Sequence, residues 1–233
     1  LYRKYGLRRY GAHGTSYRFV ADETARFLGK NKEDLRMVIA HLGNGASISA
    51  VAGGKCQDTS MGLTPLEGLV MGTRSGDIDP AVFGFLAENA NMTIAQITDM
   101  LNKKSGLLGL SGLSNDCRTI EEEAAKGHEG AILAMEVFVY RLAKYVGSMA
   151  VAAGGLDALV FTGGIGENSE LIRSKVLGYL GFLGLTEDHE ANLKARFGNA
   201  GVITTADSKA VAVVIPTNEE LMIAHDTARL SGL

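Results

Sequence analysis

The sequence predicts an α/β protein with a mixed β-sheet and helices on both faces. A short apolar run at 37–40 leads through a glycine-containing turn into an alternating run at 48–52, which is typical of two antiparallel strands. Residues 156–162 are almost wholly apolar and run into a glycine turn and a helix, as expected for a buried parallel strand. Residues 128–153 form a long helical pattern, apolar nearly all round, which predicts a helix buried against a sheet or a partner subunit.

The composition is that of an ordinary globular protein, with 46% hydrophobic and 21% charged residues. The net charge of −3 lacks the basic character of nucleic-acid-binding proteins, so no nucleic-acid partner is expected, although a small polyanion needs only local positive groups. No run reaches about 18 apolar residues, which predicts no membrane span. Cys56 and Cys117 form neither a disulfide framework nor a metal set. This fits a reducing compartment and a cytoplasmic location.

His13 lies in a glycine-flanked turn just ahead of a helix predicted over 16–28, with Thr15 or Ser16 as its N-cap and Gly29 as its stop. A histidine in that position is well placed to meet an anion. A capping or turn histidine is an equally good interpretation of the local sequence. Both interpretations stay open at this point.

The stretch HLGNGAS at 41–47 joins the first two predicted strands. Asn44-Gly45 predicts a type I′ turn, in which both central residues have positive φ. Glycines around an asparagine also leave backbone N–H groups uncovered, so that a phosphate can approach them. Taken alone, the stretch favours an ordinary hairpin without a ligand. Gly53-Gly54 then predicts a second turn and a third strand at 55–58.

Residues 58–80 have little periodicity and predict a long, ordered loop, which is usually functional. Arg74 lies among small residues in this loop. Its planar guanidinium suits a phosphoryl group that is being transferred, because it binds two oxygens and stays charged. The alternative is a structural salt bridge from Arg74 to Asp77 or Asp79.

Two helices are predicted next, over 81–89 and 93–104, followed by an apolar, glycine-broken loop at 106–112. Asp116 is a candidate to accept hydrogen bonds from a ribose, and Arg118 is a candidate to stack on a base. Asp116 is at least as well explained as the cap of a helix that starts near Thr119. Cys117 is predicted to pack in the interior, because no histidine or second cysteine is nearby.

The strand at 156–162 runs into Gly163-Gly164-Ile165-Gly166-Glu167-Asn168, with a helix predicted from Ser169. Strand, glycine turn and helix N-terminus is how nucleotide sites in α/β folds are built. The spacing matches neither the dinucleotide fingerprint nor the P-loop. Tight packing between strand and helix is the competing explanation.

The last part of the chain predicts a charged helix at 187–197, short strands at 202–205 and 210–215, and a final helix through Leu230 capped by Thr217 or Asn218. Glu219 in the first turn of that helix is favourable to the helix dipole. It is also a carboxylate at the end of a strand, where a Mg²⁺ ligand is possible. The local sequence by itself favours the dipole.

Together these stretches resemble the acetate/propionate kinase family over essentially the whole chain. Six motifs occur in the family's order: RYGAHGTS at 9–16, HLGNG at 41–45, the loop at 58–79, SNDCR at 114–118, GGIGEN at 163–168 and TNEEL at 217–221. The resemblance implies an actin/hexokinase-like (ribonuclease H-like) ATPase fold. It also implies reversible transfer of the ATP γ-phosphoryl group to acetate, giving acetyl phosphate and ADP. The implied metal is Mg²⁺, with Mn²⁺ as an alternative, and the implied assembly is a homodimer.

By position, the resemblance implies roles for these residues. His13 and Arg74 correspond to the pair that stabilises the transferring phosphoryl group. The phosphate-binding hairpin corresponds to His41, Leu42, Gly43, Asn44 and Gly45. The segment that contacts the nucleoside corresponds to Asp116, Cys117 and Arg118. The adenosine-site turn corresponds to Gly164, Ile165, Gly166, Glu167 and Asn168. Glu219 corresponds to a carboxylate associated with Mg²⁺.

Two departures from the family pattern stand out. Tyr17 replaces a residue that is usually histidine, so it donates a hydrogen bond but cannot become cationic. Family members also carry an N-terminal, acid-binding domain ahead of this point. Residues 1–233 are therefore expected to be a C-terminal nucleotide-binding and dimerisation domain that is catalytically incomplete by itself. Two alternatives remain: a kinase for propionate or another short acid, and a non-catalytic nucleotide-binding or dimerisation module.

Overall fold

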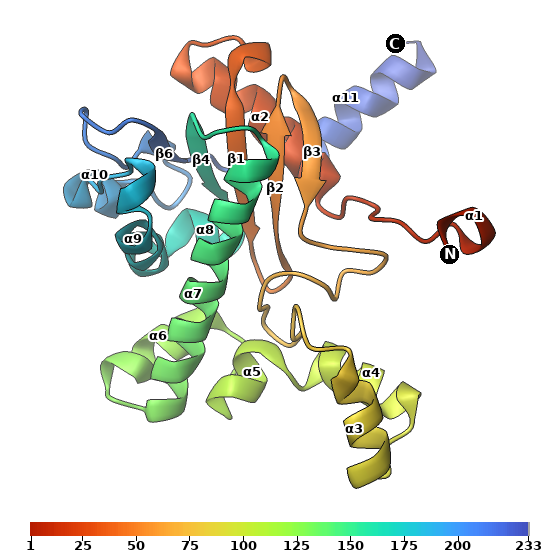
Figure 1. The fold of residues 1–233 in the computed structure, drawn as a ribbon. Helices are drawn as coiled ribbons and strands as arrows, with labels where there is room; N and C mark the ends of the chain where they lie inside the picture. Colours follow the sequence, from red (N-terminus) through yellow and green to blue (C-terminus); the bar gives the residue numbers. More distant parts are fainter. Residues whose placement is uncertain (233) are drawn as a thin grey trace.

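The computed structural model describes residues 1–232, and a six-stranded mixed sheet forms its centre (Figure 1). The strand order is β3-β2-β1-β4-β6-β5. The central strand β1 pairs antiparallel with β2 and parallel with β4, and β4 pairs parallel with β6. The predicted mixed sheet is confirmed. The strands are β1 (Arg36–Leu42), β2 (Ala46–Ala52), β3 (Lys55–Thr59), β4 (Ala158–Thr162), β5 (Gly201–Val202) and β6 (Val211–Val214).

Eleven α-helices and two short 3-10 helices accompany the sheet in the described residues. The α-helices are α1 (Tyr2–Tyr5), α2 (Gly14–Leu28), α3 (Ala81–Asn89), α4 (Ile94–Lys103), α5 (Gly106–Ser111), α6 (Cys117–Ala125), α7 (Glu129–Ala152), α8 (Gly163–Asn168), α9 (Glu170–Tyr179), α10 (His189–Lys194) and α11 (Glu219–Ser231). None of them combines the length and apolar character that a membrane crossing requires.

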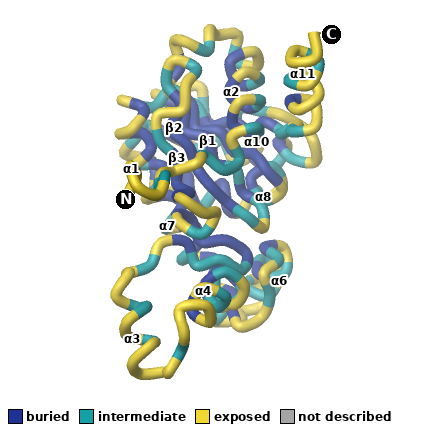
Figure 2. Tube along the Cα trace, turned by 90° about the vertical axis from the view of Figure 1, so that its right-hand side faces the viewer, coloured by how far each residue is buried: buried dark blue, intermediate teal, exposed yellow. Residues whose placement is uncertain are grey.

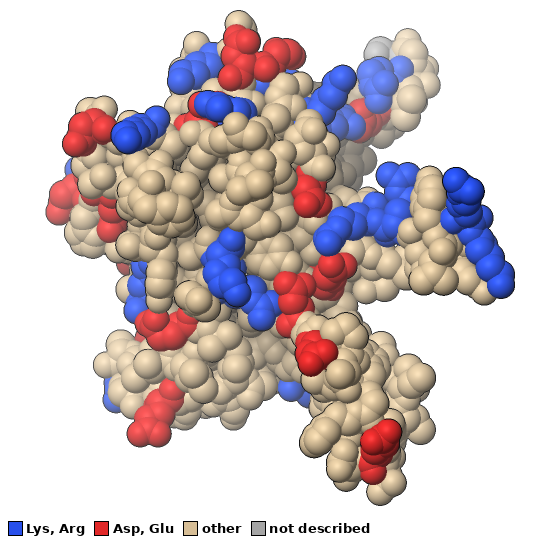
Figure 3. Space-filling view, viewed as in Figure 1, with Lys and Arg blue, Asp and Glu red and all other residues tan. Residues whose placement is uncertain are grey.

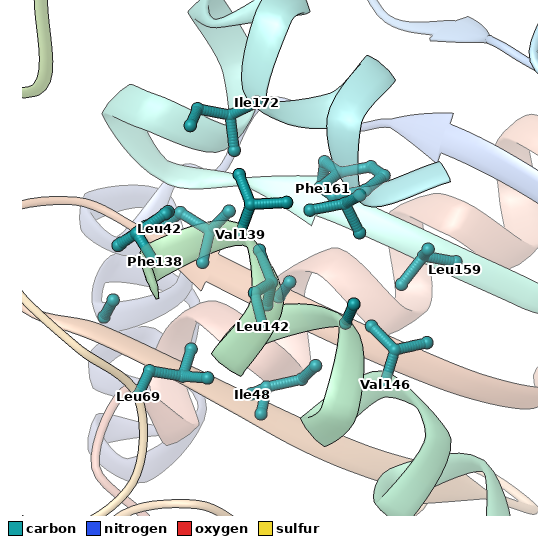
Figure 4. Packing of buried hydrophobic residues seen from close by; sticks show 14 of the residues in the cluster. Leu42, Ile48, Leu69, Phe138, Val139, Leu142, Val146, Leu159, Phe161 and Ile172 are labelled. Atoms are coloured by element: carbon teal, nitrogen blue, oxygen red, sulfur yellow. The ribbon is translucent and has the colours of Figure 1, made fainter. Parts of the chain in front are cut away.

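The alternation of side chains along β1 divides the interior into two cores. Val38, Ala40 and Leu42 share one core with the long helix α7 and with α9. Met37 and Ile39 share the other core with α2. Successive strand residues point to opposite faces, so a central strand with apolar residues at every position needs a helix on each side. Figure 4 shows the first core, in which Phe138, Val139 and Leu142 of α7 meet the sheet residues.

A helical extension lies beyond one end of the sheet (Figure 1). In it, α5 and α6 pack on α7, and α4 carries α3. No residue of α3 is buried, and Figure 2 shows this helix as exposed with a few half-buried positions. At the other extreme of the chain, α1 projects from the body with Arg3 and Lys4, and Figure 3 shows blue side chains grouped there.

Two segments that were predicted as a loop and a turn are helices in the structure. Residues 106–111 of the predicted loop at 106–112 form helix α5, because Ser105, Leu107 and Leu108 donate backbone hydrogen bonds to the loop that contains Met71 and Thr73. The predicted glycine turn at 163–168 is helix α8, whose first N–H is bonded to the Glu167 carboxylate. A loop distant in sequence at α5, and a side chain of the same helix at α8, thus satisfy backbone groups that a loop would leave to water.

Candidate functional site

Two stacked histidines lie where β1, β2 and α2 meet. His13 is the N-cap of α2 and has φ 65°, a left-handed conformation that few non-glycine residues adopt. Its ring stacks on that of His41, at the carboxyl end of β1, with centroids 4.1 Å apart and planes 18° apart. Neither Thr15 nor Ser16 caps α2, contrary to the sequence-based prediction, because the helix begins at Gly14.

Buried serine hydroxyls hold both rings. His13 Nδ1 is 2.6 Å from Ser47 Oγ, and His41 Nδ1 is 2.9 Å from Ser16 Oγ. Both serines have no exposed surface. Ser16 Oγ also lies 2.8 Å from Thr217 Oγ1 in the segment that precedes α11. The histidines are thus fixed by side chains from α2, β2 and the C-terminal region.

The burial of His13, the neighbouring His41 and the Arg74 guanidinium together lower its pKa from 6.5 to about 4, against an opposing effect of the Glu219 carboxylate. Burial also lowers the pKa of His41. Two imidazolium rings in contact would repel one another at close range. Both rings are therefore neutral at pH 7 in this structure, and the pair acts through hydrogen bonds and not through positive charge.

The depressed pKa of His13 predicts a loss of stability on acidification. Between pH 6.5 and 4 the unfolded chain takes up a proton that the folded protein does not. The stabilising contribution of neutral His13 should therefore be fully present above pH 6.5, and the free energy of unfolding should fall as the pH is lowered through that window. The expected contribution is about 2–3 kcal/mol. Urea unfolding at pH 7.5 and pH 5 measures it, with His13→Gln as the comparison. An identical pH dependence in the variant would contradict the assignment.

The hairpin loop at 43–45 is not the predicted type I′ turn. None of Gly43, Asn44 and Gly45 has positive φ. The glycine at position 45 is required by a close approach: a β-carbon placed on it would lie 3.2 Å from Arg74 Nη1 and 3.9 Å from His13 Nε2. The bare backbone of Gly45 therefore lets a guanidinium and an imidazole converge over the hairpin.

Arg74 makes no salt bridge with any described residue. Its Nη1 lies 3.4 Å from the carbonyl oxygen of Pro65 and 3.7 Å from Met71 Sδ. Asp77 accepts hydrogen bonds from Tyr145 and Gly68, and Asp79 accepts one from the backbone of Ala81 at the start of α3. The alternative interpretation, a structural salt bridge from Arg74 to Asp77 or Asp79, is therefore wrong. The Arg74 guanidinium retains hydrogen-bond donors for an anion.

Backbone hydrogen bonds fix the arginine loop, residues 71–75. Gly72 N–H donates to the Asn44 carbonyl at 2.9 Å, which ties the loop to the hairpin. From the other side, Leu107 N–H donates to Met71 and Ser105 N–H donates to Thr73. The position of Arg74 thus depends on both β1–β2 and the start of α5.

The segment 114–118 meets the hairpin through its second residue, where Asn115 Nδ2 donates to Asn44 Oδ1 at 3.0 Å. Asp116 is the N-cap of α6 and accepts from Arg118 N–H at 2.9 Å, so the capping interpretation is confirmed, with the helix starting at Cys117 and not near Thr119. Arg118 is paired with Asp116 and its side chain is 86% exposed. Cys117 is buried with a raised pKa, as expected for a packing residue.

Helix α8 lies beside the same hairpin, at the carboxyl end of β4. A β-carbon on Gly163 would lie 2.8 Å from the Leu42 carbonyl oxygen, whereas one on Gly164 would meet nothing within 4 Å. Leu42 and Ile165 contribute side chains to the core, and Asn168 bonds to Gly164 and Phe197. The side of α8 that carries Gly164 therefore has space for a ligand.

Glu167 faces inward and ties strand ends together. Its Oε1 accepts hydrogen bonds from Gly163 N–H at 2.8 Å and from Thr217 N–H at 3.1 Å. The carboxylate therefore fixes the β4–α8 turn to the segment before α11, where Glu219 follows. This geometry assigns Glu167 a role in holding the site together.

Glu219 is the first residue of α11, where it suits the helix dipole, and its charge raises the pKa of His13. No group of three His, Cys, Asp or Glu residues within 1–232 is close enough to hold a metal. Mg²⁺ commonly uses one or two carboxylates, several waters and phosphate oxygens. A single carboxylate beside the His13–Arg74 pair fits such a shared site.

Comparison with known proteins shows the family of the chain. The acetokinase family model matches residues 1–225. The chain belongs to the acetokinase family. It is 89% identical over all 233 residues to acetate kinase 1 of Neisseria meningitidis serogroup A and spans 58% of that protein. Its fold matches Porphyromonas gingivalis acetate kinase with a TM-score of 0.94 and 49% identity, over 98% of this chain and 57% of that one.

The chain is also similar to a solved structure that is named as a propionate kinase. A propionate kinase from Francisella tularensis subsp. tularensis matches with a TM-score of 0.90 and 49% identity, over 97% of this chain and 57% of that one. The chain thus spans just over half the length of these relatives.

Sequence reasoning missed the hydroxyl groups that orient the two histidines in this acetokinase-family chain. Ser16 belongs to the quoted motif at 9–16, but nothing local indicates that it bonds to Thr217, 201 positions away. Ser47 is the last residue of the quoted stretch at 41–47 and pairs with His41 across the β1–β2 ladder. That cross-strand pairing was the one available signal for Ser47.

Proposed function

We propose that this chain supplies the nucleotide site of an acetate kinase, which transfers the γ-phosphoryl group of ATP reversibly to acetate. The observation that carries the proposal is the convergence of Arg74 Nη1 and His13 Nε2 on one point above Gly45. Phosphoryl transfer spreads negative charge over the equatorial oxygens, so catalysis depends mainly on placed donors and cations. A carboxylate nucleophile needs no strong base, but its repulsion from phosphate must be screened.

In this proposal each element near the hairpin has one task. The backbone N–H groups of Asn44 and Gly45 bind phosphate oxygens, and Arg74 and His13 contact the phosphoryl group that moves. The bare backbone at Gly164 receives the adenosine, and Asp116 and Arg118 lie at the nucleoside end. Glu219 would hold Mg²⁺, directly or through water. The ion, when bound, neutralises phosphate charge.

Domain role, assembly and location are parts of the same proposal. Residues 1–233 act as the nucleotide-binding and dimerisation domain of a longer protein that also supplies the acid site. Exposed apolar side chains on α7 and α9, among them Leu133, Tyr140 and Tyr179, suit a homodimer interface. The free cysteines Cys56 and Cys117 suit the cytoplasm.

Assaying the full-length protein with ATP, Mg²⁺ and acetate, propionate or butyrate tests the function. Acetate should give the highest kcat/KM. A higher value with propionate would instead support the kinase for another short acid. Nucleotide binding without transfer to any of the three acids would support the non-catalytic module.

Neighbouring glycines in α8 give a matched test of the adenosine site. Gly164→Ala should leave the Tm within about 2 °C and raise the KM for ATP about tenfold, because its methyl group enters only the proposed ligand space. Gly163→Ala should lower the free energy of unfolding by about 2–4 kcal/mol, because Gly163 has φ 77° and its backbone touches Leu42. An unchanged KM in Gly164→Ala would remove α8 from the nucleotide site.

A further inference from the structure

A buried pair of hydroxyl groups lies behind His13, on the side away from Arg74. Tyr17 is one helical turn along α2 from His13 and is 5% exposed, and Ser47 on β2 is fully buried. Ser47 Oγ is hydrogen-bonded to Tyr17 Oη and lies 2.6 Å from His13 Nδ1. The proposed transfer reaction does not by itself use either hydroxyl.

We propose that Tyr17 and Ser47 are positioning residues that hold His13 in the neutral tautomer protonated on Nε2. The proton order is Tyr17 O–H to Ser47 Oγ, and Ser47 O–H to His13 Nδ1. Nε2–H, which points toward Gly45 and Arg74, is then a fixed donor. The inference rests on the proposed function, since that donor serves the phosphoryl group.

The alternative proton order takes away the acceptor that Ser47 provides for the Tyr17 phenol. A serine hydroxyl has one proton, so Ser47 donates to one of its two partners and accepts from the other. If His13 Nδ1–H donated to Ser47, then Ser47 would donate to Tyr17, and the phenol proton would need a third group. The other hydroxyl that acts on Tyr17 is Thr59 Oγ1, and it is not within hydrogen-bonding geometry of the phenol. Among the described residues Ser47 is the hydrogen-bond partner of Tyr17 Oη, which favours the first proton order.

The surroundings of His13 favour a neutral ring. His41 stacks on it from β1, and Arg74 approaches from its loop. Glu219 on α11 is the one carboxylate that acts on it, and its effect is smaller than those of burial and His41, so the pKa of His13 is lowered to about 4. Tyr17 is also kept neutral, because burial raises its pKa. A neutral imidazole has one N–H group, so the hydroxyl pair decides whether Nδ1 or Nε2 of His13 carries that hydrogen.

Nitrogen NMR of the full-length protein, labelled with ¹⁵N-histidine at pH 7.5, reads the tautomer directly. His13→Gln identifies the signal of His13, and the long-range coupling pattern shows which ring nitrogen carries hydrogen. We expect Nε2–H in the wild type. A wild-type signal from Nδ1–H would overturn the proposal.

Substitution of either hydroxyl should release the tautomer. In Tyr17→Phe and in Ser47→Ala, a second His13 species protonated on Nδ1 is expected, together with a fall in kcat of about 10- to 100-fold at nearly constant KM for ATP. Tyr17→His restores a donor at this position and should recover Nε2–H and most of the rate. Unaltered His13 signals in both Tyr17→Phe and Ser47→Ala would refute the role of the pair.

Thr24→Val is the matched control, because Thr24 is a buried residue of the same helix whose Oγ1 lacks a hydrogen-bond partner among the described residues. It should leave the His13 signal and kcat as in the wild type. A change of tautomer in this variant would show that loss of any buried hydroxyl in α2 disturbs His13, against the proposal. The spectra are independent of turnover, so an inactive wild type with Nε2–H would refute the proposed function alone.

Discussion

Replacing Arg74 with alanine should lower the kcat of the full-length protein about 10³-fold or more, with the KM for ATP changed less than about threefold. The reason is the lack of any carboxylate partner for Arg74 among the described residues, combined with its place 3.2 Å from the β-carbon position of Gly45. A guanidinium in that position meets negative charge that develops only as the phosphoryl group moves. Initial-rate kinetics at varied ATP concentration measure both parameters.

Two variants separate charge from general damage. Arg74→Lys keeps a cation but loses the planar fork, so it should recover only part of the lost rate. Arg26→Ala removes an arginine that pairs with Glu23 on the exposed face of α2, and it should leave kcat unchanged. A rate for Arg74→Ala within about tenfold of the wild type would exclude Arg74 from the transfer step.

Gly106→Ala should destabilise the protein by about 4 kcal/mol or more and abolish most of the activity of the molecules that remain folded. Gly106 has φ 60°, and a β-carbon there would lie 2.1 Å from the Met71 carbonyl oxygen and 2.7 Å from that of Arg74. These are backbone atoms of the arginine loop, so the loop must move. Urea unfolding and kcat of the same preparation measure the two effects.

Gly84→Ala in α3 is the control for this prediction. A β-carbon on Gly84 meets nothing within 4 Å, and the residue is helical, so alanine should raise stability slightly, by about 0.5–1 kcal/mol. Wild-type unfolding and kcat in Gly106→Ala would show that the start of α5 does not hold Arg74 in place.

The sequence alone determined the class of the fold and most of its elements. The apolar runs in β1 and β4, the alternating run in β2 and the long apolar pattern of α7 each predicted an element that the structure contains and largely buries. Burial of faces is a local property with a period of 2 or 3.6 residues. Six motifs in order were also enough to indicate the family that the chain belongs to. They placed His13, Arg74 and the hairpin among the candidate residues.

Only the tertiary structure decided how those residues meet. The turn at Asn44-Gly45 lacks the predicted positive φ values, and Gly45 is instead closely approached by Arg74. Arg74 does not form the predicted alternative salt bridge with Asp77, which is bonded to Tyr145. The tertiary structure also stacked His13 on His41 and placed hydroxyl groups from distant segments on both rings. Proton positions and unpaired charge depend on neighbours that are far apart in the chain, and no local periodicity encodes those contacts.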